Sequence, residues 1–372
     1  MARPTLRHLA EELDLSITTV SRGLAGYQDV AQATQIRVRE AASRAGYVPN
    51  SAGKSLVTGR SGFVGLVLPL GDPPVIDPFL GEFLTGLGEG LVSRGNDLFL
   101  ATTQANQSEM DVLQHVVESG RADGLVLTRV SEQDERVDYL IERGFPFITH
   151  GRTLNHSLAH GWVDTDGAAA FAESFRLLYA AGHRQFALLS INEPQSFRRF
   201  REDGLQAAIA DARDDTVSLT LCRTPRFDAT ARSSAIGELL SSASRPTAIL
   251  ALTDELALSV LEKAAEIGID VPGQLSVVGF DNLPASGWVS PTLTTFDQHT
   301  RETAVQLAHR LVDLIEGSLA DRHKNPSQHL ISPTLVHRAS HGPAPSRATD
   351  TSNRRGDANV ANPPHNPEPQ HH

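Results

Sequence analysis

The stretch LDLSITTVSRGLAGY, from Leu13 to Tyr27, decides the fold of the N-terminal region. Between Ile17 and Leu24 it has one inward apolar pair at helical spacing, Val20 with Leu24, and no carboxylate. A solvated helix normally combines an apolar stripe with oppositely charged pairs on its outer face. Short hydroxyls beside one arginine instead suit the phosphates and base edges of DNA. These residues alone leave a solvated bundle helix and a DNA-reading helix equally open.

The flanking residues predict three short helices. Thr5 is a suitable N-cap for a helix over LRHLAEEL, and Ser16 for the helix that follows. Between them, Asp14 tolerates the left-handed conformation of a tight turn. A third helix over TQIRVREAASRAG ends at Gly46. The residues of this helix expected to face inward are Ile36, Val38 and Ala42. Two helices joined by a tight turn and supported by a third form a helix-turn-helix unit.

Composition separates this N-terminal region from the rest of the chain. The 372 residues carry a net charge of -11, yet residues 1–60 hold eight Arg or Lys against five Asp or Glu. A basic arm on an acidic body is a common charge layout of nucleic-acid-binding proteins. One cysteine, Cys222, excludes a disulfide framework, and the N-terminus lacks the apolar run of a signal peptide. We therefore expect a cytoplasmic protein without a membrane span, and we expect no metal site and no cofactor.

From Gly62 onward, short apolar runs alternate with amphipathic stretches. The runs predicted as buried parallel strands are GFVGLVLPL, DLFLAT, DGLVLT, PFITH, FALLSI, VSLTLC, AILALT and LSVVGF. Strands and helices that alternate over this length predict an α/β core with two doubly wound lobes. Ligands of such folds bind beyond the carboxyl ends of the strands.

Two polar segments flank this core. SAGKSLVTGRSG reads as a flexible linker, although its first part is long enough for a short helix that forms only when something docks against it. Residues after 342 have almost nothing to bury. We expect a helix-turn-helix domain over 1–49, a hinge over 50–61, the two-lobed core over 62–342 and a disordered tail over 343–372.

Taken in order, the motifs resemble the lactose-repressor (LacI/GalR type) family of bacterial transcription regulators. The motifs that carry this resemblance are TLRHLAEELDLSITTVSRGLAG, YVPNSAGKSL, RFREDGLQAAI, TDELALSVL, IDVPGQLSVVGFDN and SPTLTTFDQ. The resemblance implies an N-terminal all-α DNA-binding domain on a core like a periplasmic sugar-binding protein. It also implies a homodimer that binds a pseudo-palindromic double-stranded operator, responds to a small carbohydrate and most often represses genes.

By this resemblance, the helix containing TTVSRGL enters the major groove. Ile17, Thr18 and Arg22 would then meet base edges, with Arg22 offering two donors to guanine. The residues that would position the DNA backbone are Thr5, Leu6, Ser16, Thr19, Ser21 and Asn50. Leu56 of the hinge would wedge into the minor groove.

The resemblance also implies an effector site between the lobes. Arg201 would bind vicinal hydroxyls, Asp281 would accept hydrogen bonds, and Phe227 would stack on a sugar ring. Asp77 and Phe79 would close the site from the first lobe. A further position is Thr253, where the family often has asparagine.

Read singly, the residues of this site have ordinary alternatives. Asp281 and Asp254 would serve as helix caps, and Arg201 as one half of a surface ion pair. The sequence also departs from the family pattern at Asp14, in place of a turn glycine, and at Ala31, in place of a capping serine. A third departure is Gly53, in place of a hinge alanine.

Other readings of the whole chain are weaker. GLGEG, at 86–90, has the wrong spacing for a nucleotide loop, and His156 with His160 lacks a third metal ligand. A cytoplasmic sugar-processing enzyme on a doubly wound fold remains the rival class. It predicts turnover of a sugar without specific DNA binding. A transport binding protein is disfavoured because no signal peptide is present.

Overall fold

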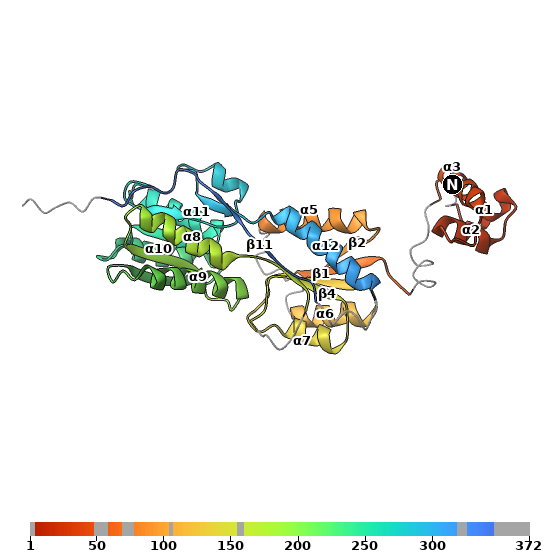
Figure 1. The fold of residues 1–372 in the computed structure, drawn as a ribbon, viewed down its shortest axis with the longest axis horizontal. Helices are drawn as coiled ribbons and strands as arrows, with labels where there is room; N and C mark the ends of the chain where they lie inside the picture. Colours follow the sequence, from red (N-terminus) through yellow and green to blue (C-terminus); the bar gives the residue numbers. More distant parts are fainter. Residues whose placement is uncertain are drawn as a thin grey trace, which may run out of the picture.

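Three short helices form the N-terminal unit, as the sequence predicts (Figure 1). They are α1 (Leu6–Leu13), α2 (Ile17–Ala25) and α3 (Gln32–Ala45). The computed structural model of the chain describes residues 4–47, 59–68, 78–103, 107–154, 160–317 and 326–345. The predicted hinge helix with Leu56, and Asn50 before it, lie outside these ranges.

Local signals start and stop these helices where the sequence predicts. The Thr5 side chain accepts a hydrogen bond from the His8 amide and caps α1, and Ser16 accepts one from the Thr19 amide, at 3.0 Å, and caps α2. Asp14 adopts φ 54°, the left-handed conformation that the tight turn needs. Gly46 caps the C-terminus of α3.

A small apolar core joins the three helices. Leu9, Val20 and Val38 are fully buried and meet between them. The prediction for Ile36 is wrong, because this side chain is 50% exposed. Position 36 lies two residues before Val38, and residues two apart point to different faces of a helix.

The remainder of the described chain forms two α/β lobes, each built on a parallel sheet (Figure 1). The first lobe has strand order β11-β5-β4-β3-β1-β2, and the second has the order β7-β6-β8-β9. The strands of the first lobe are β1 (Phe63–Leu68), β2 (Asp97–Thr102), β3 (Gly124–Leu127), β4 (Phe147–His150), β5 (Trp162–Thr165) and β11 (Gln328–Ile331). Those of the second are β6 (Gln185–Ile191), β7 (Ser218–Thr224), β8 (Ala248–Ala251) and β9 (Ser276–Val278). This arrangement confirms the predicted fold class.

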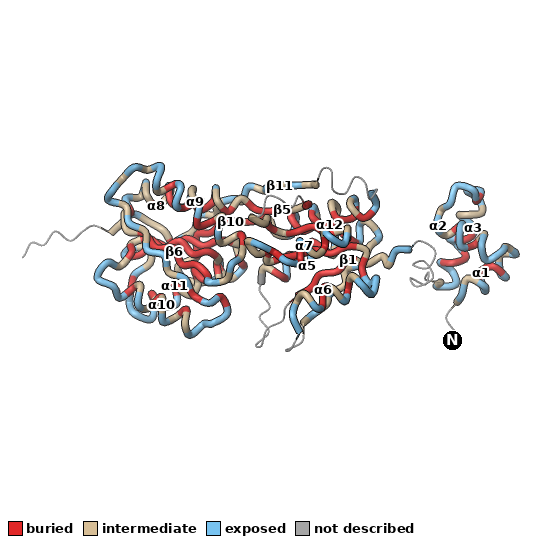
Figure 2. Tube along the Cα trace, turned by 90° about the horizontal axis from the view of Figure 1, so that it is seen from below, coloured by how far each residue is buried: buried red, intermediate tan, exposed pale blue. Residues whose placement is uncertain are grey.

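Helices cover both faces of each sheet. The first lobe has α5 (Pro78–Ser93), α6 (Glu109–Glu118), α7 (Glu135–Glu142) and α12 (Thr300–Glu316). The second has α8 (Gly167–Ala180), α9 (Ser196–Ala212), α10 (Ala229–Ser241), α11 (Asp254–Glu266) and a short 3-10 helix (Pro284–Gly287). Figure 2 shows the buried segments along the sheets with exposed chain around them. Among the described helices, none combines the length and the apolar content that a membrane span requires.

The predicted strands all form, but the expectation that all are buried is wrong for two of them. β2 and β7 lie at sheet edges, where Leu100 and Leu221 are 44% and 38% exposed. The strands β5 and β11 and the antiparallel pair β10 (Thr295–Asp297) and β12 (Thr334–Val336) were not predicted. The chain passes between the lobes at 165–167, 297–300 and 331–334, so three adjacent segments connect the two lobes of the core.

The GLGEG stretch lies inside α5 and packs against α12. A Cβ atom added to Gly86 would lie 2.1 Å from the Arg301 carbonyl oxygen, and one added to Gly90 would lie 2.6 Å from the Ala308 Cβ. These glycines allow close helix packing, in agreement with the rejection of a nucleotide loop.

Candidate functional site

The structure places the predicted DNA-contacting residues on one small domain. Ile17, Thr18, Ser21 and Arg22 are exposed on α2, while Val20 holds the helix to the core. Thr5 and Ser16 cap α1 and α2, and Thr19 lies in the first turn of α2. Leu6 differs from these residues because it is half-buried and packs against the domain core.

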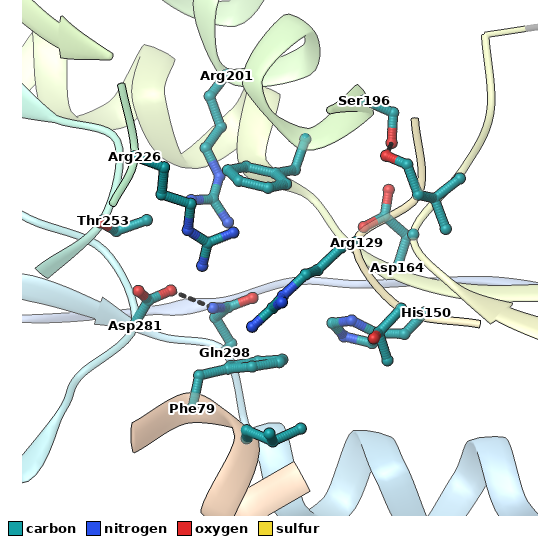
Figure 3. Close-up of a pocket in the computed structure, with 15 residues that line it drawn as sticks. Phe79, Arg129, His150, Asp164, Ser196, Arg201, Arg226, Thr253, Asp281 and Gln298 are labelled. Carbon is teal, nitrogen blue, oxygen red and sulfur yellow. Dashed lines mark hydrogen bonds between the residues drawn. The ribbon is translucent and has the colours of Figure 1, made fainter. Parts of the chain in front are cut away.

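A cavity of about 720 Å³, including its open mouth, lies between the two lobes (Figure 3). Four of the predicted effector residues line it, and they come from both lobes: Phe79, Arg201, Thr253 and Asp281. Asp77 lies outside the described residues. The cavity is bordered by the carboxyl ends of β3, β4 and β5, as expected for a doubly wound fold.

Arg201 on α9 is the most buried charged group of this cavity, with 6% of its surface exposed. Its guanidinium carbon lies 3.8 Å from the ring centre of Phe280, and its Nη1 donates to the Leu252 carbonyl oxygen. Its Nε is buried and has no hydrogen-bond acceptor among the described residues. Burial lowers the pKa of Arg201 to about 10, so it remains charged at neutral pH. The surface ion-pair alternative is therefore wrong for this residue.

Close helix packing sets the position of Arg201. A Cβ atom on Gly167 would lie 2.8 Å from the Cγ of Arg201, and one on Gly204 would lie 2.3 Å from the Ala168 carbonyl oxygen. Both glycines let α8 and α9 approach each other, and α9 carries Arg201 toward the cavity.

Asp281 faces Arg201 from the loop after β9, and the Gln298 side-chain amide donates to its carboxylate (Figure 3). Its backbone has φ 132°, a conformation that L-residues rarely adopt. Asp281 caps none of the described helices, so that alternative is wrong.

The two residues at the start of α11 have different roles. Thr253 caps α11, since its hydroxyl accepts from the Leu256 amide at 3.4 Å, and the same residue lines the cavity. Asp254 is fully buried, and it accepts hydrogen bonds from the Leu283 amide and the Ser286 hydroxyl at 2.9 and 2.7 Å. Asp254 therefore fixes the loop that carries Asp281.

Phe227 does not line this cavity. It is 50% exposed and borders a neighbouring hollow of about 1090 Å³, including open solvent, together with Arg129. The guanidinium of Arg226 lies 5.3 Å from its ring centre. The structure therefore does not bring Phe227 together with Arg201 and Asp281.

Several lining residues were missed by sequence reasoning. They are Arg129, His150, Asp164, Ser196, Arg226 and Gln298. Three of them, Arg129, His150 and Asp164, lie within two residues of the carboxyl ends of β3, β4 and β5, so the rule on strand ends offered a signal for them.

The missed residues show the marks of a functional cavity. Arg129 has φ 52°, and the Arg136 side chain holds this turn by donating to the Thr128 and Arg129 carbonyl oxygens at 3.1 and 3.4 Å. Burial lowers the pKa of His150 to about 4, so its imidazole is neutral at pH 7. Asp164 is paired with Arg152 at 2.7 Å.

One side of the cavity is closed by direct contacts between the lobes, which we name the interlobe clasp. It joins residues 130–132 of the first lobe to residues 194–198 of the second. The Glu132 amide donates to the Pro194 carbonyl oxygen, and the Ser196 amide to the Val130 carbonyl oxygen, both at 2.9 Å. Arg198 and Glu132 form an ion pair of 2.6 Å.

A helix-turn-helix unit with an exposed hydroxyl and arginine face, joined in one chain to a two-lobed core with a polar cavity, defines a ligand-responsive DNA-binding protein. Comparisons with known proteins agree. Residues 5–50 match the family model described as bacterial regulatory proteins, lacI family, and residues 175–341 match the periplasmic binding protein-like domain. The chain belongs to the LacI family of bacterial transcriptional regulators, which are not enzymes.

Relatives match along most of their length. The chain is 32% identical to the HTH-type transcriptional regulator AglR of Rhizobium meliloti (strain 1021), over 92% of this chain and 96% of that protein. It is 29% identical to CelR of Thermobifida fusca, over 86% and 94%. A solved CelR–cellobiose complex has a TM-score of 0.66 at 27% identity, over 91% of this chain and 100% of that one. The operator-bound lac repressor dimer, at 20% identity, shares the fold with a TM-score of 0.75, over 91% of this chain and 99% of that one.

Proposed function

We propose that this regulator controls carbohydrate-related genes in response to a small carbohydrate bound between its two lobes. The observation that carries the proposal is the pair formed by Arg201 and Asp281 at one buried cavity. A sugar hydroxyl both donates and accepts hydrogen bonds, so it complements a guanidinium and a carboxylate together. Phe79 supplies the apolar contact, and the cellobiose bound by the related CelR agrees with this ligand class.

Ligand binding acts through the relative position of the lobes. Three chain crossings and the interlobe clasp join the lobes, and the residues that line the cavity come from both lobes. A ligand shifts the equilibrium between two arrangements only by its difference in affinity for them. We therefore propose that the carbohydrate stabilises one lobe arrangement. This arrangement changes how the two hinge segments of a dimer, residues 50–61 of each copy, fold on the operator.

For the DNA site we propose the exposed face of α2, with Ile17, Thr18 and Arg22 at base edges. Thr5, Leu6, Ser16, Thr19 and Ser21 would position the phosphates, with Asn50 and the wedge residue Leu56 outside the described ranges. The domain limits of 1–49, 50–61 and 62–342 belong to the same proposal.

We further propose a cytoplasmic homodimer. Two identical α2 helices suit the two half-sites of a pseudo-palindromic operator. On the core, Trp288 is 82% exposed, and we propose that a second copy of the chain covers it. Sedimentation velocity of Trp288→Ala against the native chain checks this contact.

Footprinting tests the DNA site directly. Arg22→Ala should lose discrimination between an operator and random DNA, because a two-donor contact to guanine contributes about 1 to 3 kcal/mol. Ligand binding should remain intact, since Arg22 lies outside the cavity. An unchanged ratio of operator to random affinity would remove Arg22 from the base-reading residues.

A further inference from the structure

Arg22 has two neighbours that are absent from the expected set of DNA-binding residues. Its Nε donates to Oδ1 of Asp29 at 3.3 Å, and its Nη2 contacts Oδ2 of the same carboxylate. Its guanidinium carbon lies 5.0 Å from the ring centre of Tyr27. One edge of the guanidinium is thus paired, and one face is stacked.

The opposite edge of the guanidinium is available to DNA. No described residue accepts a hydrogen bond from Nη1 of Arg22, and the side chain is 45% exposed. Nη1 and the outer hydrogen of Nη2 form the two-donor fork that matches O6 and N7 of guanine. A side chain held at its other edge loses less conformational freedom when this fork binds.

The loop that carries Asp29 and Tyr27 is itself fixed. Gln35 of α3 donates through its Nε2 to the carbonyl oxygens of Tyr27 and Val30, both at 2.9 Å. Val30 is buried against the domain core, near Gly23 of α2. The Tyr27 amide donates to the Arg22 carbonyl oxygen at 3.1 Å, which ties the loop to the residue it faces.

Stability alone does not account for this arrangement. Asp29 and Arg22 are 54% and 45% exposed, and exposed ion pairs contribute little to folding. A carboxylate on a DNA-facing surface also repels phosphates, so it weakens non-specific binding. The contacts of the Asp29 carboxylate among the described residues are with the Arg22 guanidinium.

We infer that Asp29 is a specificity-determining residue, which positions Arg22 so that its free edge reads one guanine in each operator half-site. This inference rests on the proposed DNA site. The Asp29 carboxylate acts through Arg22 and contacts no DNA base itself. It lowers affinity for random DNA while it sharpens the choice at one base pair.

DNA duplexes with a randomised central segment are selected for binding to the full-length chain. Sequencing of the bound duplexes then gives the base preference at each position. The native chain should demand a G·C pair at one position of each half-site. Arg22→Ala should abolish that preference, and Asp29→Ala should reduce it about three- to tenfold at the same position, within the range of a two-donor contact. Asp29→Asn, which keeps one acceptor, should fall between the native chain and Asp29→Ala.

Two further readouts separate positioning from a structural role. Asp29→Ala should bind random duplexes more tightly than the native chain, since it removes a negative charge, and its melting temperature should stay close to native. The matched control is Glu12→Ala, which breaks the exposed Arg44–Glu12 pair of 3.1 Å on the same domain. This control should leave every base preference unchanged.

The outcomes distinguish this inference from the proposed function. A native chain without any base preference would refute the DNA-reading function itself. A preference that Arg22→Ala loses and Asp29→Ala retains in full would refute only the role of Asp29. Loss at a different base pair in Asp29→Ala would show that the carboxylate reads a base directly, which also overturns the inference.

Discussion

The interlobe clasp allows a prediction that needs no identified ligand. Glu132→Gln preserves the shape of the side chain but removes its charge from the 2.6 Å pair with Arg198. A hydrogen bond to a charged group contributes about 1.5 to 3 kcal/mol, and the glutamine amide retains part of it. The Arg198 and Glu132 side chains are 14% and 27% exposed, so solvent screens a further part of this interaction energy. We expect the clasp to weaken by about 1 kcal/mol, or about fivefold in its opening equilibrium.

Amide hydrogen exchange measures this opening. The Ser196 amide donates across the clasp to the Val130 carbonyl oxygen, so it exchanges only when the clasp opens. Its exchange should become about fivefold faster in Glu132→Gln, while amides inside β6 and β8 should keep their native rates. The control Glu118→Gln breaks the exposed 3.5 Å pair with Arg143 on the first lobe and should not change the Ser196 rate.

Two results would refute this reasoning. An unchanged Ser196 rate would show that the ion pair does not hold the lobes together. An equal acceleration throughout the second lobe would show that the substitution destabilises the whole fold. If the bound arrangement is the clasped one, the affinity for a carbohydrate falls only as far as the clasped fraction of molecules falls.

Two more predictions concern the cavity. Arg201→Ala and Asp281→Ala should each abolish the response to a carbohydrate, because each strands a desolvated partner at a cost of about 1 to 3 kcal/mol; native affinity in calorimetry of either variant would exclude that residue. His150 should make stability depend on pH, because its folded pKa of about 4 lies below its ordinary value of 6.5. The unfolded chain alone binds this proton as pH falls from about 6.5 to 4, so the stability is full above that window and declines by at most about 3 kcal/mol within it, and by less where the imidazole faces cavity water. Urea unfolding at pH 7 and pH 5 should therefore show a smaller loss in His150→Gln than in the native chain, with the exposed His115→Gln as control; equal losses in both would contradict this account.

The sequence predicts elements well where local signals decide them. Thr5, Ser16 and Gly46 act at helix ends through neighbours within a few residues, and the structure shows the caps that were predicted. Exposure at a sheet edge is different, because it depends on strand order. The apolar run of β2 does not reveal that this strand has a single neighbour, β1.

The cavity was predicted in part for the same reason. Arg201 and Asp281 could be named from motifs, but Gln298 and Ser196 become lining residues only through contacts between distant segments. Phe227 lies one residue after Arg226, yet only Arg226 lines the cavity, because the chain turns at these two residues and their side chains leave it in different directions. The family resemblance that suggested Phe227 does not specify the direction in which its side chain points.

A single helix connects the cavity to the start of the core. Gln298, which binds Asp281, lies two residues before α12, and the far end of α12 holds Arg60, whose Nη2 donates to the Ile315 carbonyl oxygen at 2.9 Å. Beside this anchor, the Asp123 carboxylate accepts hydrogen bonds from the amides of residues 61 and 62, both at 2.7 Å. A helix of this length spans about 25 Å and is packed along α5, so it moves as one body. Residues 60 and 61, at the end of the predicted hinge, and residue 62 after it are thus fastened at one end of α12, while the other end of α12 lies two residues from Gln298 at the ligand site.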